Sequence, residues 1–324
     1  MRSNILDILR QANGTYVSGE DIARTMNVSR TAVWKHIREL KQAGYAIDSH
    51  SRSGYCLMET PDLLLPSEIQ NGRKTKVLGK DIQYYKEVIS TNNQAKFAAQ
   101  QDAGEGTIIV SEAQTSGRGR LARGWYSPAE KGIWFSVILR PHFLPQEAPK
   151  CTLLAAVAIV KAIETITEIQ VGIKWPNDIL YNKLKLVGIL TEMNAEMDCI
   201  NYIIIGMGIN VNIQKNEFPL ELQHIATSLA IIKGKKISRV QLLNEILFQI
   251  ETLYNIAQAE GFVKILEEWK KYSVTLGKTV DVIGINDTFA GLAMDIDADG
   301  ALLVKTKAGI KRVLAGDVSI RAKG

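Results

Sequence analysis

The residues of this chain best suited to chemistry are three arginines set among glycines, at positions 117–125. Arg118, Arg120 and Arg123 carry permanent charges with forked donors that match carboxylate and phosphate oxygens. The intervening glycines permit left-handed backbone and the close approach of a ligand. Because the apolar run 107–110 precedes this segment, a strand delivers the cationic loop, and we expect the loop to close over an anion. A solvated basic surface turn would have the same composition.

Three segments further along combine polar side chains with small or rigid residues. Residues 174–178 (Lys-Trp-Pro-Asn-Asp) bring together a cation, an aromatic ring, a proline turn and two polar groups. Residues 185–192 have the sequence Lys-Leu-Val-Gly-Ile-Leu-Thr-Glu, and residues 206–212 have the sequence Gly-Met-Gly-Ile-Asn-Val-Asn. Since Asx turns and glycine bulges are common, each segment alone indicates little, but together they indicate a single binding site.

These four segments, in this order, resemble those of biotin protein ligases. With the helix-turn-helix pattern at the start of the chain, the resemblance is to the bifunctional biotin ligase and biotin-operon repressors of bacteria, and it covers nearly the whole sequence. It implies that biotin and ATP condense to biotinyl-5′-adenylate with Mg²⁺, and that biotin passes to a lysine of the biotin carboxyl carrier protein of acetyl-CoA carboxylase. It also implies binding to operator DNA of biotin genes, with the adenylate as co-repressor, and a homodimer favoured by that adenylate.

The resemblance implies roles for individual residues. Those expected to be catalytic are Lys185, Arg118 and Arg120. Those expected to contact biotin are Ser90, Thr91, Asn92, Gln114, Gly117, Arg118, Gly119, Arg120, Lys185, Gly188, Gly206 and Gly208. Those expected at the nucleotide, partly from their aromatic or polar character alone, are Arg120, Arg123, Trp125, Trp134, Lys174, Asn177, Asp178 and Asn210. Asp178 is also the expected Mg²⁺ ligand, because that ion prefers carboxylate oxygen.

Two of these assignments have ordinary structural alternatives. Ser90-Thr91-Asn92 is equally a helix N-cap, and we expect it to serve as both. Apolar residues alternate on both faces of residues 184–190, so we expect this strand to be buried and Lys185 to need a partner. The resemblance supplies one, since the family's lysine bridges the biotin carboxylate and the α-phosphate. The alternative is that Lys185 still belongs to the turn at 182–183 and extends to solvent.

Residues 1–62 are predicted to form a winged helix-turn-helix DNA-binding domain. Apolar residues at helical spacing mark three helices, of which the second and third begin at Ser18 and Ser29. Short strands at 45–49 and 54–58 form the wing. Beside the cap Ser29, the residues expected at base edges are Arg30, Thr31 and Trp34, and those expected at phosphates are Lys35, Arg38 and Arg52. A packing or dimerisation module with a basic outer face would have the same pattern.

Residues 63–273 are predicted to form a mixed α/β catalytic domain. The expected strands are 82–87, 107–112, 132–139, 171–174, 179–181, 186–192 and 202–209, and the expected helices are 92–101, 151–167, 239–259 and 261–272. Residues 274–324 change to short β segments, at 279–283, 288–295, 302–306, 311–315 and 318–321. Tight turns separate them, which predicts a small SH3-like β-barrel. A simple cap without a role in the site would have the same pattern.

Composition excludes several other classes. With 324 residues, 46% of them apolar, and a net charge of +5, the chain is expected to be globular with an anionic partner. Its 3 cysteines and 4 histidines have neither disulfide nor metal-ligand spacing, and no nucleophile pairs with a histidine. The longest apolar run, 153–160, is too short to cross a bilayer. We therefore expect a cytoplasmic protein with no membrane role.

Two other functions share part of this pattern. A lipoate or octanoate ligase uses the same adenylate chemistry, but the N-terminal module and the sequence Gly-Arg-Gly-Arg at 117–120 argue against it. A transcription factor that senses a ligand without turnover would keep the same pocket. Lys185 and the three arginines of the loop argue against that alternative.

Overall fold

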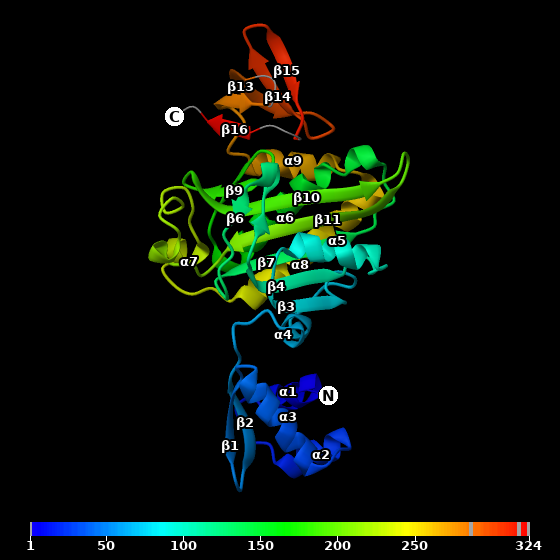
Figure 1. Ribbon diagram of the computed structural model, residues 1–324, viewed down its shortest axis with the longest axis vertical. Helices are drawn as coiled ribbons and strands as arrows, with labels where there is room; N and C mark the ends of the chain where they lie inside the picture. Colours follow the sequence, from blue (N-terminus) through cyan, green and yellow to red (C-terminus); the bar gives the residue numbers. More distant parts are fainter. Residues whose placement is uncertain (1, 285–287, 316–318, 323–324) are drawn as a thin grey trace. The chain divides into compact units, whose positions relative to one another are not determined.

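The computed structural model describes residues 2–284, 288–315 and 319–322, and the chain divides into two compact units, Met1–Leu63 and Leu64–Gly324. The first unit contains α1 (Arg2–Gln11), α2 (Gly19–Met26), α3 (Arg30–Gln42) and an antiparallel hairpin of β1 (Ala46–His50) and β2 (Gly54–Glu59) (Figure 1). This is the predicted helix-turn-helix followed by a wing.

Serine caps and apolar spacing produce the helices of the first unit where the sequence predicts them. Ser18 Oγ accepts the N–H of Asp21 at 3.0 Å, and Ser29 Oγ accepts the N–H of Ala32 at 3.2 Å. Both serines therefore satisfy a free amide of the first helical turn. Asn27 ends α2 in the left-handed region, with φ of 52°, which makes the turn into α3 tight.

A seven-stranded mixed sheet forms the centre of the second unit. Its strand order is β3-β4-β7-β11-β10-β9-β8, and only β3 and β4 pair in parallel among the described strands. The strands are β3 (Ile82–Val88), β4 (Ile108–Gln114), β7 (Gly132–Leu139), β8 (Gly172–Lys174), β9 (Asp178–Tyr181), β10 (Leu184–Ala195) and β11 (Ile200–Asn210). The mixed sheet confirms the predicted fold class.

Helices cover both faces of this sheet (Figure 1). One face packs on α6 (Lys150–Thr167), α8 (Arg239–Glu260) and α9 (Val263–Tyr272), and the other packs on α5 (Thr91–Gln100). Along β11, Ile203, Ile205 and Ile209 belong to the large core with α6 and α8, whereas Ile204 packs with α5. Because side chains alternate along a strand, Gly206 and Gly208 face the side of α5. The shorter helical elements are α4 (Pro66–Asn71), α7 (Leu229–Lys233), η2 (Pro145–Glu147) and η3 (Lys215–Glu217).

A buried ion pair at the start of α8 is absent from the sequence-based predictions. Arg239 Nη1 lies 2.7 Å from Glu112 Oε2, and the two residues are 0% and 3% exposed. Glu112 Oε1 also accepts the N–H of Leu64 at 2.7 Å. Since a buried charge needs a partner, this pair holds the first residue of the second unit against β4.

The C-terminal β segments form a small antiparallel sheet, in the region where the sequence predicts a small SH3-like β-barrel. Its strands are β12 (Thr279–Ile283), β13 (Thr288–Ile296), β14 (Leu302–Thr306), β15 (Gly309–Val313) and β16 (Ser319–Ala322), in the order β15-β14-β13-β12-β16. No ladder joins β15 to β16 among the described residues, and residue 318, predicted in the last strand, lies outside them. Val280, Val282 and Leu302 continue the core of α6 and α8. Within the described chain, every helix is too short or too polar to cross a membrane.

Candidate active site

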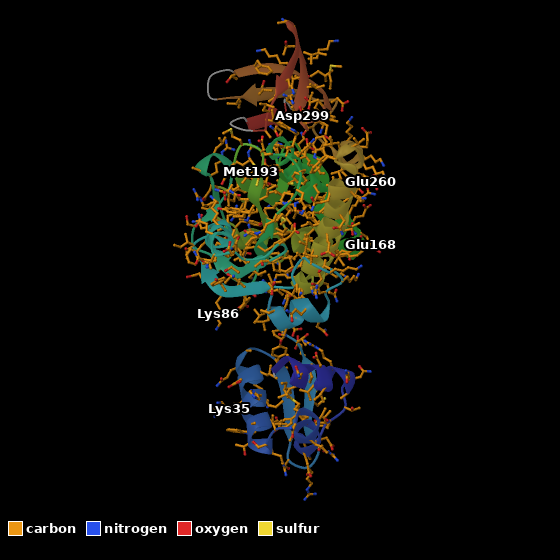
Figure 2. All side chains as sticks on the ribbon, turned by 90° about the vertical axis from the view of Figure 1, so that its right-hand side faces the viewer. Lys35, Lys86, Glu168, Met193, Glu260 and Asp299 are labelled. Carbon is orange, nitrogen blue, oxygen red and sulfur yellow. The ribbon has the colours of Figure 1, made fainter. Side chains whose placement is uncertain are left out.

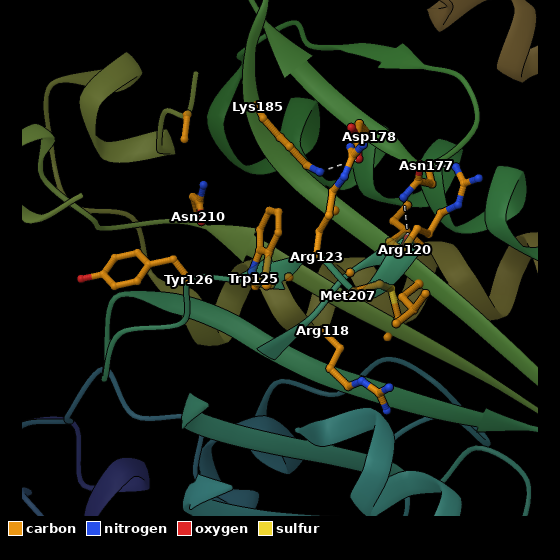
Figure 3. A pocket seen from close by; sticks show the side chains of 18 of the residues that line it. Arg118, Arg120, Arg123, Trp125, Tyr126, Asn177, Asp178, Lys185, Met207 and Asn210 are labelled. Atoms are coloured by element: carbon orange, nitrogen blue, oxygen red, sulfur yellow. Dashed lines mark hydrogen bonds and ion pairs between the residues drawn. The ribbon is translucent and has the colours of Figure 1, made fainter. Parts of the chain in front are cut away.

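A cavity of about 590 Å³ lies at the start of α5, between the arginine loop, β10 and β11 (Figure 3). Among the described residues that line it are six cations and one carboxylate, namely Arg118, Arg120, Arg123, Lys174, Lys183, Lys185 and Asp178. The cations come from two parts of the sequence, residues 118–123 and residues 174–185. Because like charges in one concave site raise the local potential, the cavity favours an anionic ligand.

The arginine loop is a short hairpin of β5 (Gly117–Arg118), η1 (Arg120–Ala122) and β6 (Gly124–Trp125). The glycines of this loop permit left-handed backbone, but Leu121 and Ala122 are the residues that adopt it, each with φ of 55°. Such residues cost about 1 kcal/mol or more each and occur where the surrounding structure imposes them. Gly117 instead permits close packing, since a Cβ there would lie 2.5 Å from the carbonyl oxygen of Trp125. Gly117, which the resemblance placed at biotin, is therefore a packing position and is not among the described residues that line the cavity.

Two arginines of the loop are held by neutral acceptors. Arg120 Nη1 donates to Asn177 Oδ1 at 3.1 Å (Figure 3), and its Nη2 donates to the carbonyl of Ala315. Arg118 Nη1 donates to Asn93 Oδ1 at 3.1 Å. Because Asn93 is neutral, this contact orients Arg118 without cancelling its charge. Arg123 also lines the cavity.

Lys185 has a carboxylate partner inside the cavity. Its Nζ lies 2.8 Å from Asp178 Oδ1 and 5.1 Å from the ring centroid of Trp125 (Figure 3). Its side chain is 35% exposed, and Leu184 and Leu190 are half-buried, so the expectation of burial on both faces of this strand holds only for part of it. Lys185 therefore has a partner within the protein that the sequence did not predict, Asp178, and it remains accessible from the cavity.

The floor of the cavity depends on two glycines paired across the sheet. Gly188 of β10 lies opposite Gly208 of β11, and Cβ atoms there would lie 2.8 and 2.2 Å from the indole of Trp125. The indole therefore rests directly on backbone. Its Nε1–H is buried and has no acceptor among the described residues.

The opposite end of the cavity is lined by buried polar groups at the start of α5. The N–H of Thr91 donates to Gln114 Oε1 at 2.9 Å, and Asn92 Nδ2 donates to Glu192 Oε2 at 2.8 Å. Gly206 has no room for a side chain, because a Cβ would lie 1.9 Å from Asn92 Oδ1. Ser90 occupies the N-cap position, but its side chain makes no capping hydrogen bond. The three residues Ser90, Thr91 and Asn92 therefore face the cavity together.

Sequence reasoning missed Ser136, which supports this polar end from β7. Its Oγ lies 2.8 Å from Thr91 Oγ1 and 2.7 Å from Asn92 Oδ1, and the residue is fully buried. The available signal was one hydroxyl in the otherwise apolar strand 132–139. A buried hydroxyl needs a hydrogen-bond partner, and here its partners are Thr91 and Asn92 of the predicted site.

Of the four remaining residues expected at the nucleotide, three line the cavity and the fourth, Trp134, does not. Lys174, Asn177 and Asn210 line the cavity. Asn177 Nδ2 donates to the carbonyl of Ile189 at 2.9 Å, which fixes the loop against β10.

The structure places Trp134 outside the cavity, contrary to the prediction. Trp134 is fully buried, packs with Ile213 and Phe218, and donates its Nε1–H to the carbonyl of Pro128 at 3.2 Å. Its ring lies back over Gly132, where a Cβ would come within 2.2 Å. The sequence shows an aromatic residue but not the direction of its ring.

The site contains few metal-binding groups. No group of three or more His, Cys, Asp or Glu suited to a metal occurs in the described part of the chain. Asp178 is the single carboxylate of the described cavity lining. It fits Mg²⁺ only with a nucleotide present, because Mg²⁺ commonly binds one or two carboxylates together with phosphates.

The predicted DNA-binding residues belong to the first unit and are exposed. Arg30, Thr31, Trp34, Lys35 and Arg38 lie along α3, and Arg52 lies in the turn between β1 and β2. Lys35 projects outward from α3 (Figure 2), and the guanidinium of Arg38 lies 5.3 Å from the ring centroid of Trp34. Ser29 is the N-cap residue of α3, where its hydroxyl accepts the N–H of Ala32.

Comparison with known proteins gives the class first. Residues 85–210 match the biotin/lipoate A/B protein ligase family, residues 2–56 match a helix-turn-helix (HTH) domain, and residues 275–321 match the biotin protein ligase C-terminal domain. Together with the cation-lined cavity, these matches define a ligase joined to a helix-turn-helix unit.

Similarity to individual proteins shows which family of ligases the chain belongs to. The chain is 44% identical over 320 residues to the bifunctional ligase/repressor BirA of Bacillus subtilis, covering 99% of this chain and 98% of that protein. It is 30% identical to the biotin--[acetyl-CoA-carboxylase] ligase of Mycobacterium tuberculosis, over 66% of this chain and 79% of that protein. The structure of biotin protein ligase from Aquifex aeolicus in complex with biotin and ATP matches with a TM-score of 0.67 and 31% identity, covering 75% of this chain and 100% of that one. The chain belongs to the family of bifunctional biotin ligase/repressors.

Proposed function

We propose that this protein forms biotinyl-5′-adenylate from biotin and ATP and transfers biotin to a lysine of the carboxyl carrier protein of acetyl-CoA carboxylase. The observation that carries the proposal is the position of Lys185, an accessible cation at the centre of a cavity with a buried polar end and an arginine-rich side. The similarity to the biotin--[acetyl-CoA-carboxylase] ligase of Mycobacterium tuberculosis supports the choice of carrier.

The two ends of the cavity suit the two substrates. The buried donors and acceptors of Thr91, Asn92 and Gln114 match the ureido ring of biotin, which both donates and accepts hydrogen bonds. The segment with Lys174, Asn177 and Asp178 takes the nucleotide. The biotin carboxylate and the α-phosphate then meet beside Lys185, Arg118 and Arg120. Cations there offset the repulsion of two anions, and holding the reactants together supplies much of the rate enhancement.

In the first step a carboxylate oxygen of biotin attacks the α-phosphorus of ATP, the bond from that phosphorus to the bridging oxygen breaks, and pyrophosphate leaves. Lys185 exchanges Asp178 for the carboxylate and α-phosphate oxygens. Arg118 and Arg120 stabilise the charge that develops on the phosphate. Bound Mg²⁺, held by Asp178 and the phosphates, would neutralise charge on the leaving pyrophosphate.

In the second step the neutral amine of the carrier lysine attacks the acyl carbon of the adenylate. The bond from that carbon to the phosphate oxygen breaks, AMP leaves, and the amine nitrogen loses one proton. No covalent bond to the ligase forms. The arginine loop, closed over the anhydride, excludes water until the carrier arrives.

We also propose that the first unit binds operator DNA of biotin genes, with the adenylate as co-repressor and a homodimer as the binding species. Two-fold symmetry of a dimer suits an inverted-repeat operator. A cytoplasmic location follows from these partners, since ATP, carrier and operator are found there.

The test is transfer of labelled biotin to a purified carrier domain with Mg-ATP, run beside lipoate and beside Lys185→Ala and Arg118→Ala. Transfer of biotin alone, slowed by either substitution, is expected. Transfer of lipoate instead would identify the other ligase activity. Binding of biotin without adenylate or conjugate would identify a ligand sensor and contradict the proposal.

A further inference from the structure

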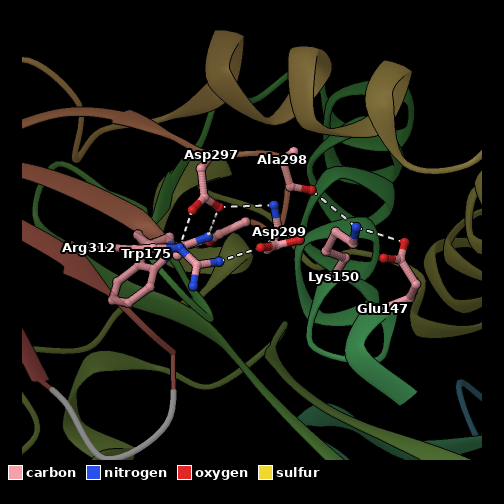
Figure 4. A network of polar contacts seen from close by, with 9 residues as sticks. Glu147, Lys150, Trp175, Asp297, Ala298, Asp299 and Arg312 are labelled. Carbon is pink, nitrogen blue, oxygen red and sulfur yellow. Dashed lines mark hydrogen bonds and ion pairs between the residues drawn. The ribbon is translucent and has the colours of Figure 1, made fainter. Parts of the chain in front are cut away.

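The C-terminal β domain contacts the segment 174–178 through a buried tryptophan. Trp175 is 1% exposed, and its backbone N–H donates to Thr275 Oγ1 at 2.9 Å. Its indole Nε1–H donates to the carbonyl of Gly300 at 3.0 Å (Figure 4). Both acceptors belong to the residues from 274 onward. One tryptophan of the active-site segment is thus attached to the C-terminal domain at two points.

The turn that accepts the indole is held by several polar contacts of its own. Asp297 Oδ1 accepts the N–H groups of Asp299 and Ala301, each at 2.9 Å, and the guanidinium of Arg312 pairs with both Asp297 and Asp299 (Figure 4). Gly300 has φ of 77°, and a Cβ there would lie 2.7 Å from Leu153 Cδ1. Only glycine suits this position, so the direction of its carbonyl is set by the turn.

The same turn is attached to the helical layer behind the sheet. Lys150, which is 5% exposed, donates to the carbonyl of Ala298 at 3.1 Å and pairs with Glu147 at 2.7 Å (Figure 4). Lys150 is the first residue of α6, the helix that packs on β10. The turn therefore has a fixed position relative to the strand that carries Lys185.

Trp175 precedes the residues that face the nucleotide side of the cavity. Asn177 accepts from Arg120 at 3.1 Å and donates to Ile189 at 2.9 Å, and Asp178 pairs with Lys185 at 2.8 Å. A shift of Trp175 would move both side chains. Arg120 also donates to Ala315 of the C-terminal domain.

The other end of the cavity is supported differently. The hydrogen-bond partners found for Thr91, Asn92 and Gln114 are Ser127, Ser136, Leu190 and Glu192. All of them lie outside the C-terminal domain. Among the described residues, the hydrogen bonds of that domain therefore reach the nucleotide side and not the polar end at α5.

We propose that Trp175 is a positioning residue: through Thr275 and Gly300, the C-terminal domain sets the place of Asn177 and Asp178 and thereby the affinity for ATP, but not for biotin. This inference rests on the proposed function, because it assigns the two substrates to the two ends of the cavity.

The experiment compares Trp175→Phe with Trp269→Phe in the full-length protein. Trp269 is also fully buried, in α9, but its Nε1–H has no acceptor among the described residues. Both variants replace a buried indole with a smaller ring, and only the first loses a hydrogen bond. The measurements are KM for ATP and for biotin in pyrophosphate release, binding of a non-hydrolysable ATP analogue by calorimetry, and the thermal unfolding temperature.

For Trp175→Phe we expect KM for ATP and the analogue Kd to rise about fivefold or more, the factor that corresponds to one buried hydrogen bond. KM for biotin should stay within about twofold. Trp269→Phe should lower the unfolding temperature without changing either KM selectively. Equal ATP affinities in the two variants, or a parallel rise in both KM values of Trp175→Phe, would overturn the inference.

If Trp175→Phe does not fold, Thr275→Val supplies the same test, because it removes one hydroxyl acceptor without changing volume. We expect the same selective loss of ATP affinity, and recovery in Thr275→Ser. Failure of the unsubstituted protein to form an adenylate would contradict the proposed function instead. In that case the calorimetry of the ATP analogue still decides the role of Trp175.

Discussion

Lys185 and Asp178 form an ion pair across one hairpin, with 2.8 Å between Nζ and Oδ1. Asp178 begins β9 and Lys185 is the second residue of β10, and the two-residue turn between these strands contains Asn182 and Lys183, with φ of 47° and 70°. Positive φ at both positions is typical of a type I′ turn, which sets the twist and register of a hairpin. The turn therefore brings the Lys185 ammonium and the Asp178 carboxylate together.

Replacement of Lys185 by methionine keeps most of the side-chain volume and removes the charge. We expect kcat for adenylate formation to fall about 10²- to 10³-fold, the usual cost of one preorganised donor in a transition state. The readout is release of labelled pyrophosphate at saturating biotin and ATP. Lys86→Met, an exposed residue of β3, is the matched control, and equal rates in the two variants would contradict a catalytic role.

Gly208→Ala tests the glycine floor under Trp125. The added Cβ would lie 2.2 Å from Trp125 Nε1, so the indole has to move. Overpacking of this kind costs about 1 kcal/mol or more, and we expect affinity for biotinyl-adenylate, measured by calorimetry, to fall at least about fivefold. The control is Gly104→Ala, where a Cβ meets no atom within 4 Å. Unchanged affinity in Gly208→Ala would show that the ligand does not depend on the position of this indole.

The exposed cations of α3 predict the salt dependence of operator binding. Removal of one cation that binds a phosphate should reduce the slope of log Kd against log salt concentration by about one. We expect this change for Lys35→Ala and for Arg38→Ala, without an effect on biotin transfer. Lys86→Ala, in the second unit, should keep the original slope. An unchanged slope in both α3 variants would show that these residues do not bind the DNA backbone.

Asp297 predicts an acid-dependent contribution to stability. Burial alone would raise the pKa of its carboxyl, but hydrogen bonds from Arg312 and from the N–H groups of Ala301 and Asp299 outweigh burial and lower it below the ordinary 3.8. A lowered pKa in the folded state stabilises the protein above the ordinary value, and this contribution disappears as pH falls through the lowered one. The difference in unfolding free energy between the protein and Asp297→Asn should therefore be constant from about pH 5 to 7 and shrink below about 3.8. Denaturant titrations across this range measure it, and a constant difference down to about pH 2 would contradict the ionised role.

Local patterns in the sequence were enough to predict most of the framework, and the resemblance to biotin protein ligases indicated most of the residues that line the cavity. Ser18 and Ser29 start helices because a serine hydroxyl satisfies a free amide wherever the next turn is helical. The nearly continuous apolar run predicts β7 with its observed ends, at 132 and 139. The segments at 117–125, 174–178 and 206–210 meet in one cavity, as expected of polar residues that interrupt apolar strands.

Local patterns could not predict the contacts between residues that are distant in the sequence, because such contacts depend on which surfaces meet after folding. Arg239 and Glu112 pair across 127 positions, and Trp175 reaches Gly300 across 125. Trp134 and Trp125 are both aromatic residues near the predicted site, yet one ring packs into the core and the other lies over Gly208. The left-handed backbone falls on Leu121 and Ala122, although glycines stand beside them. Residue type limits what a side chain can do, but its direction and its neighbours are set by packing, which is a property of the whole chain.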